Sequence, residues 1–181
     1  GLGHAVWCAR DIIGDEPFAV MLPDMLMMAQ PSCLAQMAGV YAKTGGNVIA
    51  VEACDDPSMY GVIDPESKDG RVIKMKGMVE KPKREVAPSN LAISGRYILQ
   101  PEIFKLLEDQ KPGAGNEIQL TDAMARLMQM QTFHALEYDG VTYDCGDKIG
   151  YLRANAAFAL ANTEYGAKAA ETLAKLLAER G

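Results

Sequence analysis

The sequence predicts an α/β fold: a mixed sheet flanked by helices, with a small antiparallel β insertion and helices at the C-terminus. Three patterns predict it. There are short apolar runs typical of buried strands, a helical pattern between two of them, and a group of short strand-like runs separated by turn residues. Apolar residues make up 49% of the 181 residues and charged residues 23%, enough for one domain with a sizeable core. These values exclude disorder, a collagen and a bare coiled coil.

The first third of the chain predicts a strand, a helix and a second strand. Phe18–Leu22 is an unbroken apolar run closed by Pro23, and residues 48–51 (Val-Ile-Ala-Val) form another. We expect both strands to be buried on both faces. Between them, residues 32–44 have helical spacing and end at Gly45-Gly46. This arrangement is a βαβ unit, which nearly always crosses over right-handed.

The middle of the chain predicts the antiparallel insertion. Short strands are expected at residues 60–63, 72–76 and 78–80. Pro65 is expected to interrupt the region, and Asp69-Gly70 is a hairpin-type turn signal. Residues 91–99 predict a longer strand, and Pro101 suits the first turn of a short helix.

The last third returns to helix. Residues 117–130 carry apolar side chains at a period close to 3.6, which predicts an amphipathic helix. Residues 133–138 and 141–145 predict strands on either side of Asp139-Gly140. From Lys148 the chain is rich in alanine and predicts helix, with a break at Gly166.

Net charge and composition limit the partners. The net charge of −6 and the pI near 5.0 argue against nucleic acid, because a phosphate backbone requires a basic surface. Phosphorylated small molecules remain compatible, since they need only a few local cations. No uncharged apolar run approaches the ~20 residues of a membrane span, so we expect no membrane partner. No leader pattern is visible at the start, and we expect a cytoplasmic protein.

The cysteines predict neither a zinc site nor disulfides. The four cysteines contain no CxxC pair, and the chain has only two histidines. We expect free thiols in a reducing compartment. A thiol enzyme using Cys145 ranks low, because no histidine lies at a suggestive spacing.

Two aspartates are candidate metal ligands. Asp24 directly follows the first predicted strand, and Asp144 lies at the end of the strand at 141–145. Carboxylates at strand ends suit Mg²⁺, which prefers one or two carboxylates together with phosphate oxygens. Gly146 would permit close backbone approach. The alternative for each aspartate is a turn or a helix cap.

Glu80-Lys81-Pro82 is a candidate sugar-phosphate site. Neighbouring strand residues point to opposite faces, so Glu80 and Lys81 face one pocket only if the strand stops between them, as Pro82 favours. A carboxylate there would accept hydrogen bonds from hydroxyls and an ammonium would meet a phosphate. The alternative is a solvated charge pair. Tyr60-Gly61 opens a strand where backbone could reach a ligand, or where a bulge lies.

Two further segments carry weaker signals. Gly1-Leu-Gly-His-Ala begins a predicted helix, and its backbone N–H groups could contact a base or a phosphate. We interpret His4 as structural. Asn90 could orient a ligand or cap a turn, and turns are commoner.

The order of the short motifs resembles one enzyme family, the bacterial-type UTP–glucose-1-phosphate uridylyltransferases, also called UDP-glucose pyrophosphorylases. The resemblance runs from Gly1 to about Tyr151. The motifs that carry it are residues 1–6 (GLGHAV), 14–17 (GDEP), 22–24 (LPD), 60–62 (YGV), 79–82 (VEKP), 88–92 (PSNLA), 95–97 (GRY), 112–115 (PGAG), 117–123 (EIQLTDA) and 144–146 (DCG).

The resemblance implies a Rossmann-like nucleotidyltransferase fold and places roles on particular residues. Asp24 and Asp144 match the family's metal pair for Mg²⁺, and Gly3 matches the glycine beside the uracil. In the sugar-phosphate pocket, Tyr60 and Gly61 match the family's motif, Gly61 and Glu80 would contact glucose hydroxyls, Lys81 the phosphate, and Asn90 would line the sugar side.

The implied reaction is glucose 1-phosphate plus UTP giving UDP-glucose and pyrophosphate. It proceeds by in-line attack on the α-phosphorus, with Lys81 and Asp24 as the catalytic residues. The resemblance implies a partial nucleotidyltransferase domain over residues 1–147. Residues 148–181 form a helical segment in which Leu173, Leu176 and Leu177 could pack against another subunit, and we expect a homo-oligomer.

One departure from the family concerns the N-terminus. Family members begin with a strand and a glycine-rich loop carrying Arg and Lys for the triphosphate, and no such loop occurs in this sequence. If the polypeptide starts at Gly1, we expect at best weak sugar-phosphate binding and no turnover. The alternatives are another sugar-nucleotide pyrophosphorylase, such as a glucose-1-phosphate thymidylyltransferase, or a non-catalytic sugar-phosphate-binding or assembly module.

Overall fold

The computed structural model describes residues 1–179 and divides into two compact units. The first unit comprises residues 1–22 and 30–139, and the second comprises residues 23–29 and the chain from residue 140 onward. The strands are β1 (Phe18–Met21), β2 (Met25–Met28), β3 (Asn47–Ala53), β4 (Gly61–Asp69), β5 (Val72–Glu80), β6 (Leu91–Leu99), β7 (Phe133–Glu137) and β8 (Val141–Asp144). The α-helices are α1 (Leu2–Trp7), α2 (Arg10–Ile13), α3 (Cys33–Thr44), α4 (Ile103–Glu108), α5 (Leu120–Leu127), α6 (Lys148–Ala161) and α7 (Gly166–Ala178).

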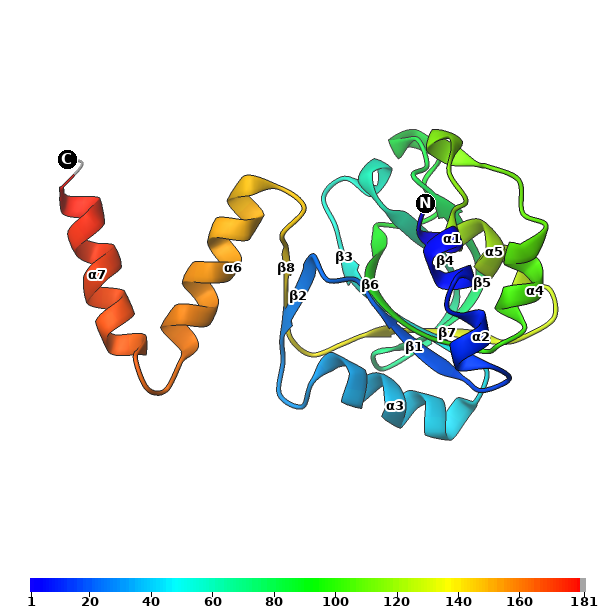
Figure 1. Ribbon diagram of the computed structural model, residues 1–181, viewed down its shortest axis with the longest axis horizontal. Helices are drawn as coiled ribbons and strands as arrows, with labels where there is room; N and C mark the ends of the chain where they lie inside the picture. The colour runs from blue at the N-terminus through cyan, green and yellow to red at the C-terminus, as the bar shows by residue number, and fades with distance from the viewer. Residues whose placement is uncertain (180–181) are drawn as a thin grey trace. The chain divides into compact units, whose positions relative to one another are not determined.

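The first unit is built on a six-stranded mixed sheet in the order β1-β6-β3-β7-β5-β4. Strands β3 and β7 are parallel, and the other neighbouring pairs are antiparallel. Helix α3 covers one face, while α1, α4 and α5 cover the other (Figure 1). The predicted fold class, a mixed α/β sheet with an antiparallel insertion and C-terminal helices, is confirmed.

Strand β3 separates the two layers of the core. Val48 and Ala50 alternate with Ile49 and Val51, and all four are at most 1% exposed. Ile49 and Val51 belong to the large apolar cluster that the strands form with α1, α4 and α5. The prediction that this segment is buried on both faces is confirmed.

The prediction that β1 is buried on both faces is wrong. Its side chains alternate between half-buried and exposed, and Met21 is 58% exposed. The reason lies in its place at the end of the strand order, where it pairs with β6 alone. Phe18 packs on one side, with its ring stacked 4.9 Å from that of Phe104. Strands β1 and β3 run parallel, as a βαβ unit requires, but β6 lies between them.

Helix α3 begins and ends where its sequence predicts. Ser32 Oγ accepts a hydrogen bond from the Ala35 N–H at 3.3 Å, which caps the N-terminus. Gly45 follows with φ of 62°, a conformation that suits glycine at the end of a helix. Cys33, Met37 and Val40 are the buried residues on its sheet-facing side.

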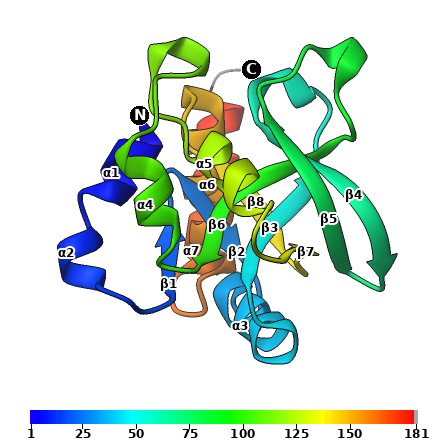
Figure 2. The ribbon, with the colours of Figure 1, turned by 90° about the vertical axis from the view of Figure 1, so that its right-hand side faces the viewer.

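The three predicted short strands of the insertion are one long hairpin. Strands β4 and β5 pair from Gly61 opposite Glu80 to Asp69 opposite Val72, and Figure 2 shows the two strands side by side. Pro65 does not interrupt β4, because the register shifts on both sides of it and the irregularity absorbs a residue that cannot donate to the ladder. The predicted turn at Asp69-Gly70 is confirmed, with Gly70 at φ of 57°.

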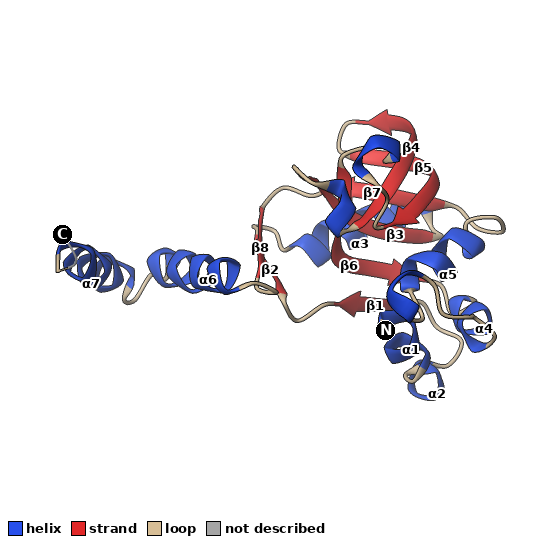
Figure 3. Ribbon diagram, turned by 90° about the horizontal axis from the view of Figure 1, so that it is seen from above, coloured by secondary structure: helices blue, strands red, loops and turns tan. Residues whose placement is uncertain are grey.

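The second unit contains a strand that the sequence did not predict. Strand β2 pairs antiparallel with β8, so that Met25 lies opposite Asp144 and Met28 lies opposite Val141 (Figure 3). The two helices that follow match the prediction, with α7 beginning at Gly166. No helix within residues 1–179 is both long and apolar enough to cross a bilayer.

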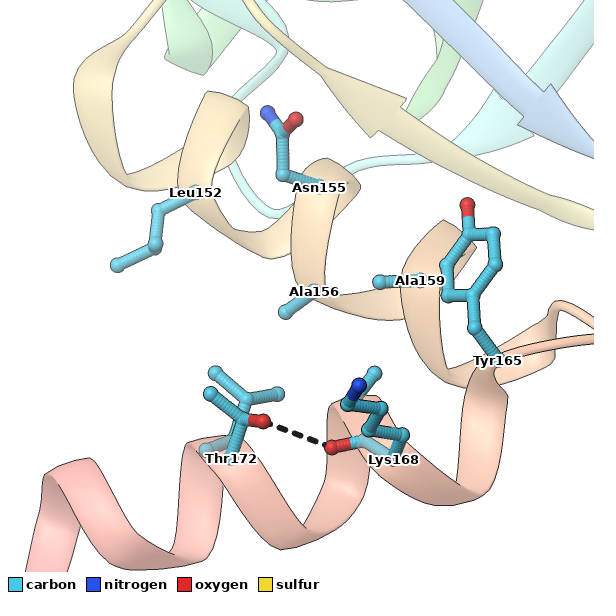
Figure 4. A pocket seen from close by; sticks show the side chains of 9 residues that line it. Leu152, Asn155, Ala156, Ala159, Tyr165, Lys168 and Thr172 are labelled. Carbon is cyan, nitrogen blue, oxygen red and sulfur yellow. Dashed lines mark hydrogen bonds between the residues drawn. The ribbon is translucent and has the colours of Figure 1, made fainter.

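Helices α6 and α7 leave apolar side chains uncovered. A groove of about 420 Å³ runs between them, lined mainly by Leu152, Ala156, Ala159, Tyr165, Ala169 and Leu173 (Figure 4). Leu176 and Leu177 on α7 are 54% and 76% exposed. The predicted division of the chain into a nucleotidyltransferase domain (residues 1–147) and a helical segment (residues 148–181) stays a prediction. The two compact units are divided at residues 22/23, 29/30 and 139/140 instead.

Candidate functional site

Gly61, Glu80 and Thr121 form a polar group at one end of the hairpin, which we call the Glu80 cluster. Gly61 and Glu80 lie directly opposite each other on β4 and β5. The hydroxyl of Thr121, in the first turn of α5, donates a hydrogen bond to Glu80 Oε2 at 2.6 Å. Thr121 is 7% exposed, so this bond fixes the carboxylate from its buried side.

The tight space at position 61 favours glycine. A Cβ there would lie 3.1 Å from Glu80 Oε2, 3.1 Å from Thr121 Oγ1 and 3.2 Å from Ile93 Cδ1. These distances are shorter than ordinary van der Waals contacts. A side chain would therefore press on the Thr121–Glu80 hydrogen bond, and its absence makes room for the carboxylate and the hydroxyl.

The chain bends immediately after Glu80. Strand β5 ends at Glu80, and the N–H of Lys81 donates to the carbonyl of Tyr60 at 3.0 Å. Lys81 has φ of 44°, an uncommon conformation for a residue with a side chain, and Lys81 is exposed. The prediction that the strand stops between Glu80 and Lys81 is confirmed. Local strain of this kind clusters at functional sites.

Asp24 and Asp144 lie side by side in the second unit, and we call them the carboxylate pair. Asp24 immediately precedes β2 and Asp144 ends β8, and the N–H of Cys145 donates to the Asp24 carbonyl at 2.7 Å. A Cβ on Gly146 would lie 2.9 Å from Asp144 Oδ1 and 4.0 Å from Asp24 Oδ2. The two carboxylate oxygens therefore border the same small space, which the missing side chain of Gly146 leaves open.

The carboxylate pair fits a small divalent cation held in part by a ligand. Mg²⁺ needs only one or two protein carboxylates when substrate phosphates complete its octahedron. No group of three or more His, Cys, Asp or Glu side chains within residues 1–179 is arranged to bind a metal alone. One oxygen of Asp144 also accepts the Gly146 N–H at 2.8 Å, which orients the carboxylate.

Asp147 is nearby in sequence but has another role. Its Oδ1 accepts the N–H groups of Ile149 and Gly150 at 2.7 and 3.0 Å and caps helix α6. These two hydrogen bonds, first that from Gly150, hold the pKa of the Asp147 carboxyl below its usual value. Asp147 is therefore an ionised cap.

Close packing explains why a glycine occupies position 3. Its N–H donates to the carbonyl of Ile118 at 2.9 Å, and a Cβ there would lie 2.9 Å from Leu107 Cδ2 and from two atoms of Ile118. Asn90 is exposed, and its carbonyl accepts the Cys54 N–H at 2.9 Å. Their predicted contacts with uracil and sugar stay predictions.

The structure thus brings together Tyr60, Gly61, Glu80 and Lys81 in the first unit, and Asp24 and Asp144 in the second. Thr121 is the residue that sequence reasoning missed. Its side chain lies beside Glu80 only because α5 packs on β5, 41 positions away in the sequence. The signal was present as the motif Glu117–Ala123, whose threonine lies in the first turn of the helix.

Comparisons with known proteins show the family of the chain. A family model described as "Nucleotidyl transferase" matches residues 1–160. The chain is 48% identical over 166 residues to UTP–glucose-1-phosphate uridylyltransferase of Bacillus subtilis, covering 91% of this chain and 57% of that protein. The chain therefore spans less than two thirds of the length of this relative.

Solved structures give the same result. A crystal structure of UDP-glucose pyrophosphorylase complexed with UDP-glucose matches with a TM-score of 0.84 and 45% identity, over 87% of this chain and 61% of that one. The UTP-bound enzyme from Acinetobacter baumannii matches with a TM-score of 0.85 and 39% identity, over 97% and 62% of the two chains.

Proposed function

Because the chain belongs to the nucleotidyl transferase family, we propose that it provides the sugar-phosphate and metal-binding part of a UTP–glucose-1-phosphate uridylyltransferase. The reaction joins glucose 1-phosphate and UTP to give UDP-glucose and pyrophosphate. The observation that carries the proposal is the Glu80 cluster, in which a buried hydroxyl holds a carboxylate beside a glycine. Relatives named for this activity, at up to 48% identity, support it.

The Glu80 cluster would bind the hexose. The Glu80 carboxylate, held by Thr121, accepts hydrogen bonds from sugar hydroxyls, and the lack of a side chain at Gly61 leaves that carboxylate in place. Lys81 follows the strand end and neutralises the phosphate of glucose 1-phosphate. That phosphate is the nucleophile, and it attacks the α-phosphorus of UTP in line with the departing pyrophosphate. These residues act by positioning and by charge, without a covalent intermediate.

The carboxylate pair would hold Mg²⁺. When bound, Mg²⁺ supplies neutralisation of the charge that develops on the phosphate oxygens. Asp24 and Asp144 orient their oxygens toward the space beside Gly146, and Cys145 keeps the backbone of Asp24 in place through its N–H. Mg²⁺ dependence is part of the proposal.

The exposed apolar side chains of α6 and α7 support the further proposal that the protein is a homo-oligomer. Uncovered apolar faces of this kind commonly mark protein interfaces. The cytoplasmic location expected from the sequence stays a prediction.

The test measures binding and turnover in the same preparation. Calorimetry with glucose 1-phosphate and UDP-glucose is expected to give saturable binding that Glu80→Gln weakens about tenfold or more, because a hydrogen bond to a charged group contributes about 1.5–3 kcal/mol. Glu85→Gln, a change of the same kind at an exposed residue in the short 3-10 helix that follows, serves as the control. Pyrophosphate release is followed with UTP and with dTTP. Equal binding by the wild type and Glu80→Gln, or a preference for dTTP, would contradict the proposal.

A further inference from the structure

A polar groove lies on the opposite face of the sheet from the Glu80 cluster. It has a volume of about 560 Å³, and its polar lining is Gln36, Lys43 and Thr44 from α3, Ser67 and Asp69 from β4, Lys74 from β5 and His134 from β7. We call it the α3 groove. Its volume falls in the range of small-molecule sites.

The strand register places three of these side chains in one row. Ser67 lies opposite Lys74 across β4 and β5, and Lys74 lies opposite His134 across β5 and β7. Directly paired residues on neighbouring strands point to the same face of a sheet. That face is covered by α3 only beside β3, β6 and β7, so the row extends past the edge of the helix.

The α3 groove is distinct from the Glu80 cluster in both face and position. The neighbours of Lys74 on β5, Ile73 and Met75, point into the core beneath α5, on the same side as Glu80. Gly61 and Ser67 are six residues apart on β4, which corresponds to roughly 20 Å along a strand. A ligand in the α3 groove would not touch the Glu80 cluster.

Two lysines and a histidine supply an unusual set of donors. Lys43 has no ion-pair partner among residues 1–179. Lys74 forms an ion pair with Glu66 at 2.9 Å, and the side chains of Lys74 and Glu66 are each about half exposed. His134 Nδ1 is buried and lacks a hydrogen-bond partner within the described chain. A buried polar atom left without a partner is rare and points to a missing ligand or water.

The other polar groups of the groove suit hydroxyls. Asp69 carries an acceptor carboxylate, and Ser67 can both donate and accept. Two backbone carbonyls in the last turn of α3 already accept hydrogen bonds. Thr44 Oγ1 donates to the Val40 carbonyl at 3.0 Å, and the Gly45 N–H donates to the Tyr41 carbonyl at 2.8 Å. The groove therefore offers both cations and partners for hydroxyls within one lining.

We propose that the α3 groove binds a small phosphorylated polyol, with its phosphate on Lys43, Lys74 and His134 and its hydroxyls on Asp69 and Ser67. Burial, and secondly the charge of Lys74, lower the pKa of His134, so the imidazole is neutral at pH 7 and offers one donor. A bound phosphate would favour the imidazolium and raise that pKa.

The two histidines of the chain make the test local. With ¹³C-labelled histidine, the ring signals of His134 report on the α3 groove, while exposed His4 is the internal control. The probes are glycerol phosphate, inorganic phosphate and glycerol. We expect glycerol phosphate to shift the His134 signals saturably and to raise the pH midpoint of His134, with His4 unchanged.

Three variants separate the groove from general charge effects. Lys43→Gln and Lys74→Gln are each expected to weaken the binding of glycerol phosphate about tenfold, or about 1.4 kcal/mol. Lys68→Gln is the matched control, because Lys68 lies on the same hairpin and is also ion-paired, with Glu137, but does not line the α3 groove. Circular dichroism checks that each variant is folded.

Each other outcome overturns a defined part of the proposal. Absence of a saturable His134 shift, or equal weakening by Lys68→Gln, overturns the site itself. Inorganic phosphate binding as tightly as glycerol phosphate overturns the assignment of hydroxyl contacts to Asp69 and Ser67. Binding of glycerol as tight as that of glycerol phosphate overturns the assignment of the phosphate.

Discussion

Substitution of Gly61 by alanine tests the geometry of the Glu80 cluster. The new methyl group would lie 3.1 Å from Glu80 Oε2 and from Thr121 Oγ1, and 3.2 Å from Ile93 Cδ1. Each neighbour must move by a few tenths of an ångström to reach ordinary contact. Ile93 is buried in the core and Thr121 belongs to α5, so the Glu80 carboxylate moves most readily.

The expected consequence is a weaker ligand site in a folded protein. Displacement of the carboxylate loosens the 2.6 Å hydrogen bond from Thr121, and a hydrogen bond to a charged group contributes about 1.5–3 kcal/mol. We expect the dissociation constant for glucose 1-phosphate to rise about tenfold, and overpacking to lower the free energy of unfolding by about 1–3 kcal/mol.

Calorimetry with glucose 1-phosphate and urea unfolding measure the two effects. Gly39→Ala is the matched control, because no atom lies within 4 Å of a Cβ at that position in α3. It should leave binding unchanged and stabilise the helix by about 0.5–1 kcal/mol. Wild-type affinity in Gly61→Ala would refute the idea that this glycine makes room for the Glu80 carboxylate.

Three further predictions concern stability and reactivity. Asn47→Ala should lower the free energy of unfolding by about 1–3 kcal/mol in urea denaturation, because Asn47 is fully buried and its Oδ1 accepts the Gln100 N–H at 2.9 Å; exposed Gln129→Ala should change it little. Burial raises the pKa of the Cys33 thiol to about 11, so a thiol reagent at about pH 8 should modify exposed Cys8 in the native protein and Cys33 only after unfolding; equal rates would contradict this. The pKa of His134 is lowered from 6.5 in the folded protein, so its contribution to the free energy of unfolding is complete above pH 6.5 and is lost as the pH falls below that value. The wild type should therefore lose more stability than His134→Gln between about pH 7.5 and pH 5.5. Equal losses in the two proteins would argue against this assignment.

Local patterns in the sequence predicted the elements that depend on local chemistry. The start of α3 next to Ser32, the glycine after α3 and the turn at Asp69-Gly70 all lie where expected, because each depends on hydrogen bonds or dihedral angles within a few residues. The end of β5 at Glu80 was predicted for the same reason, since Pro82 cannot continue a ladder.

Elements that depend on distant partners were missed or divided wrongly. Strand β2 has four residues, and its partner β8 lies more than a hundred residues away, so nothing in its own sequence distinguishes it from a loop. Strand β4 passes through Pro65 because pairing with β5 on both sides holds it there. The exposure of β1 follows from its place at the end of the strand order, which is a property of the whole sheet.

The same distinction holds for the candidate site. Asp24, Asp144, Gly61 and Glu80 were found from strand-end positions and from motif order. Thr121 was not, because its role depends on the packing of α5 against β5. Asp147 could be assigned as a cap only once helix α6 was located.

The carboxylate pair is tested most directly by titrating Mn²⁺, a paramagnetic substitute for Mg²⁺, into the protein with UDP-glucose present and counting bound ions by electron paramagnetic resonance. The wild type and the control Asp109→Asn should bind one Mn²⁺ that Mg²⁺ displaces, while Asp24→Asn and Asp144→Asn should each weaken that binding about tenfold or more. Undiminished Mn²⁺ binding in both of those variants would contradict the assignment of Asp24 and Asp144 as metal ligands.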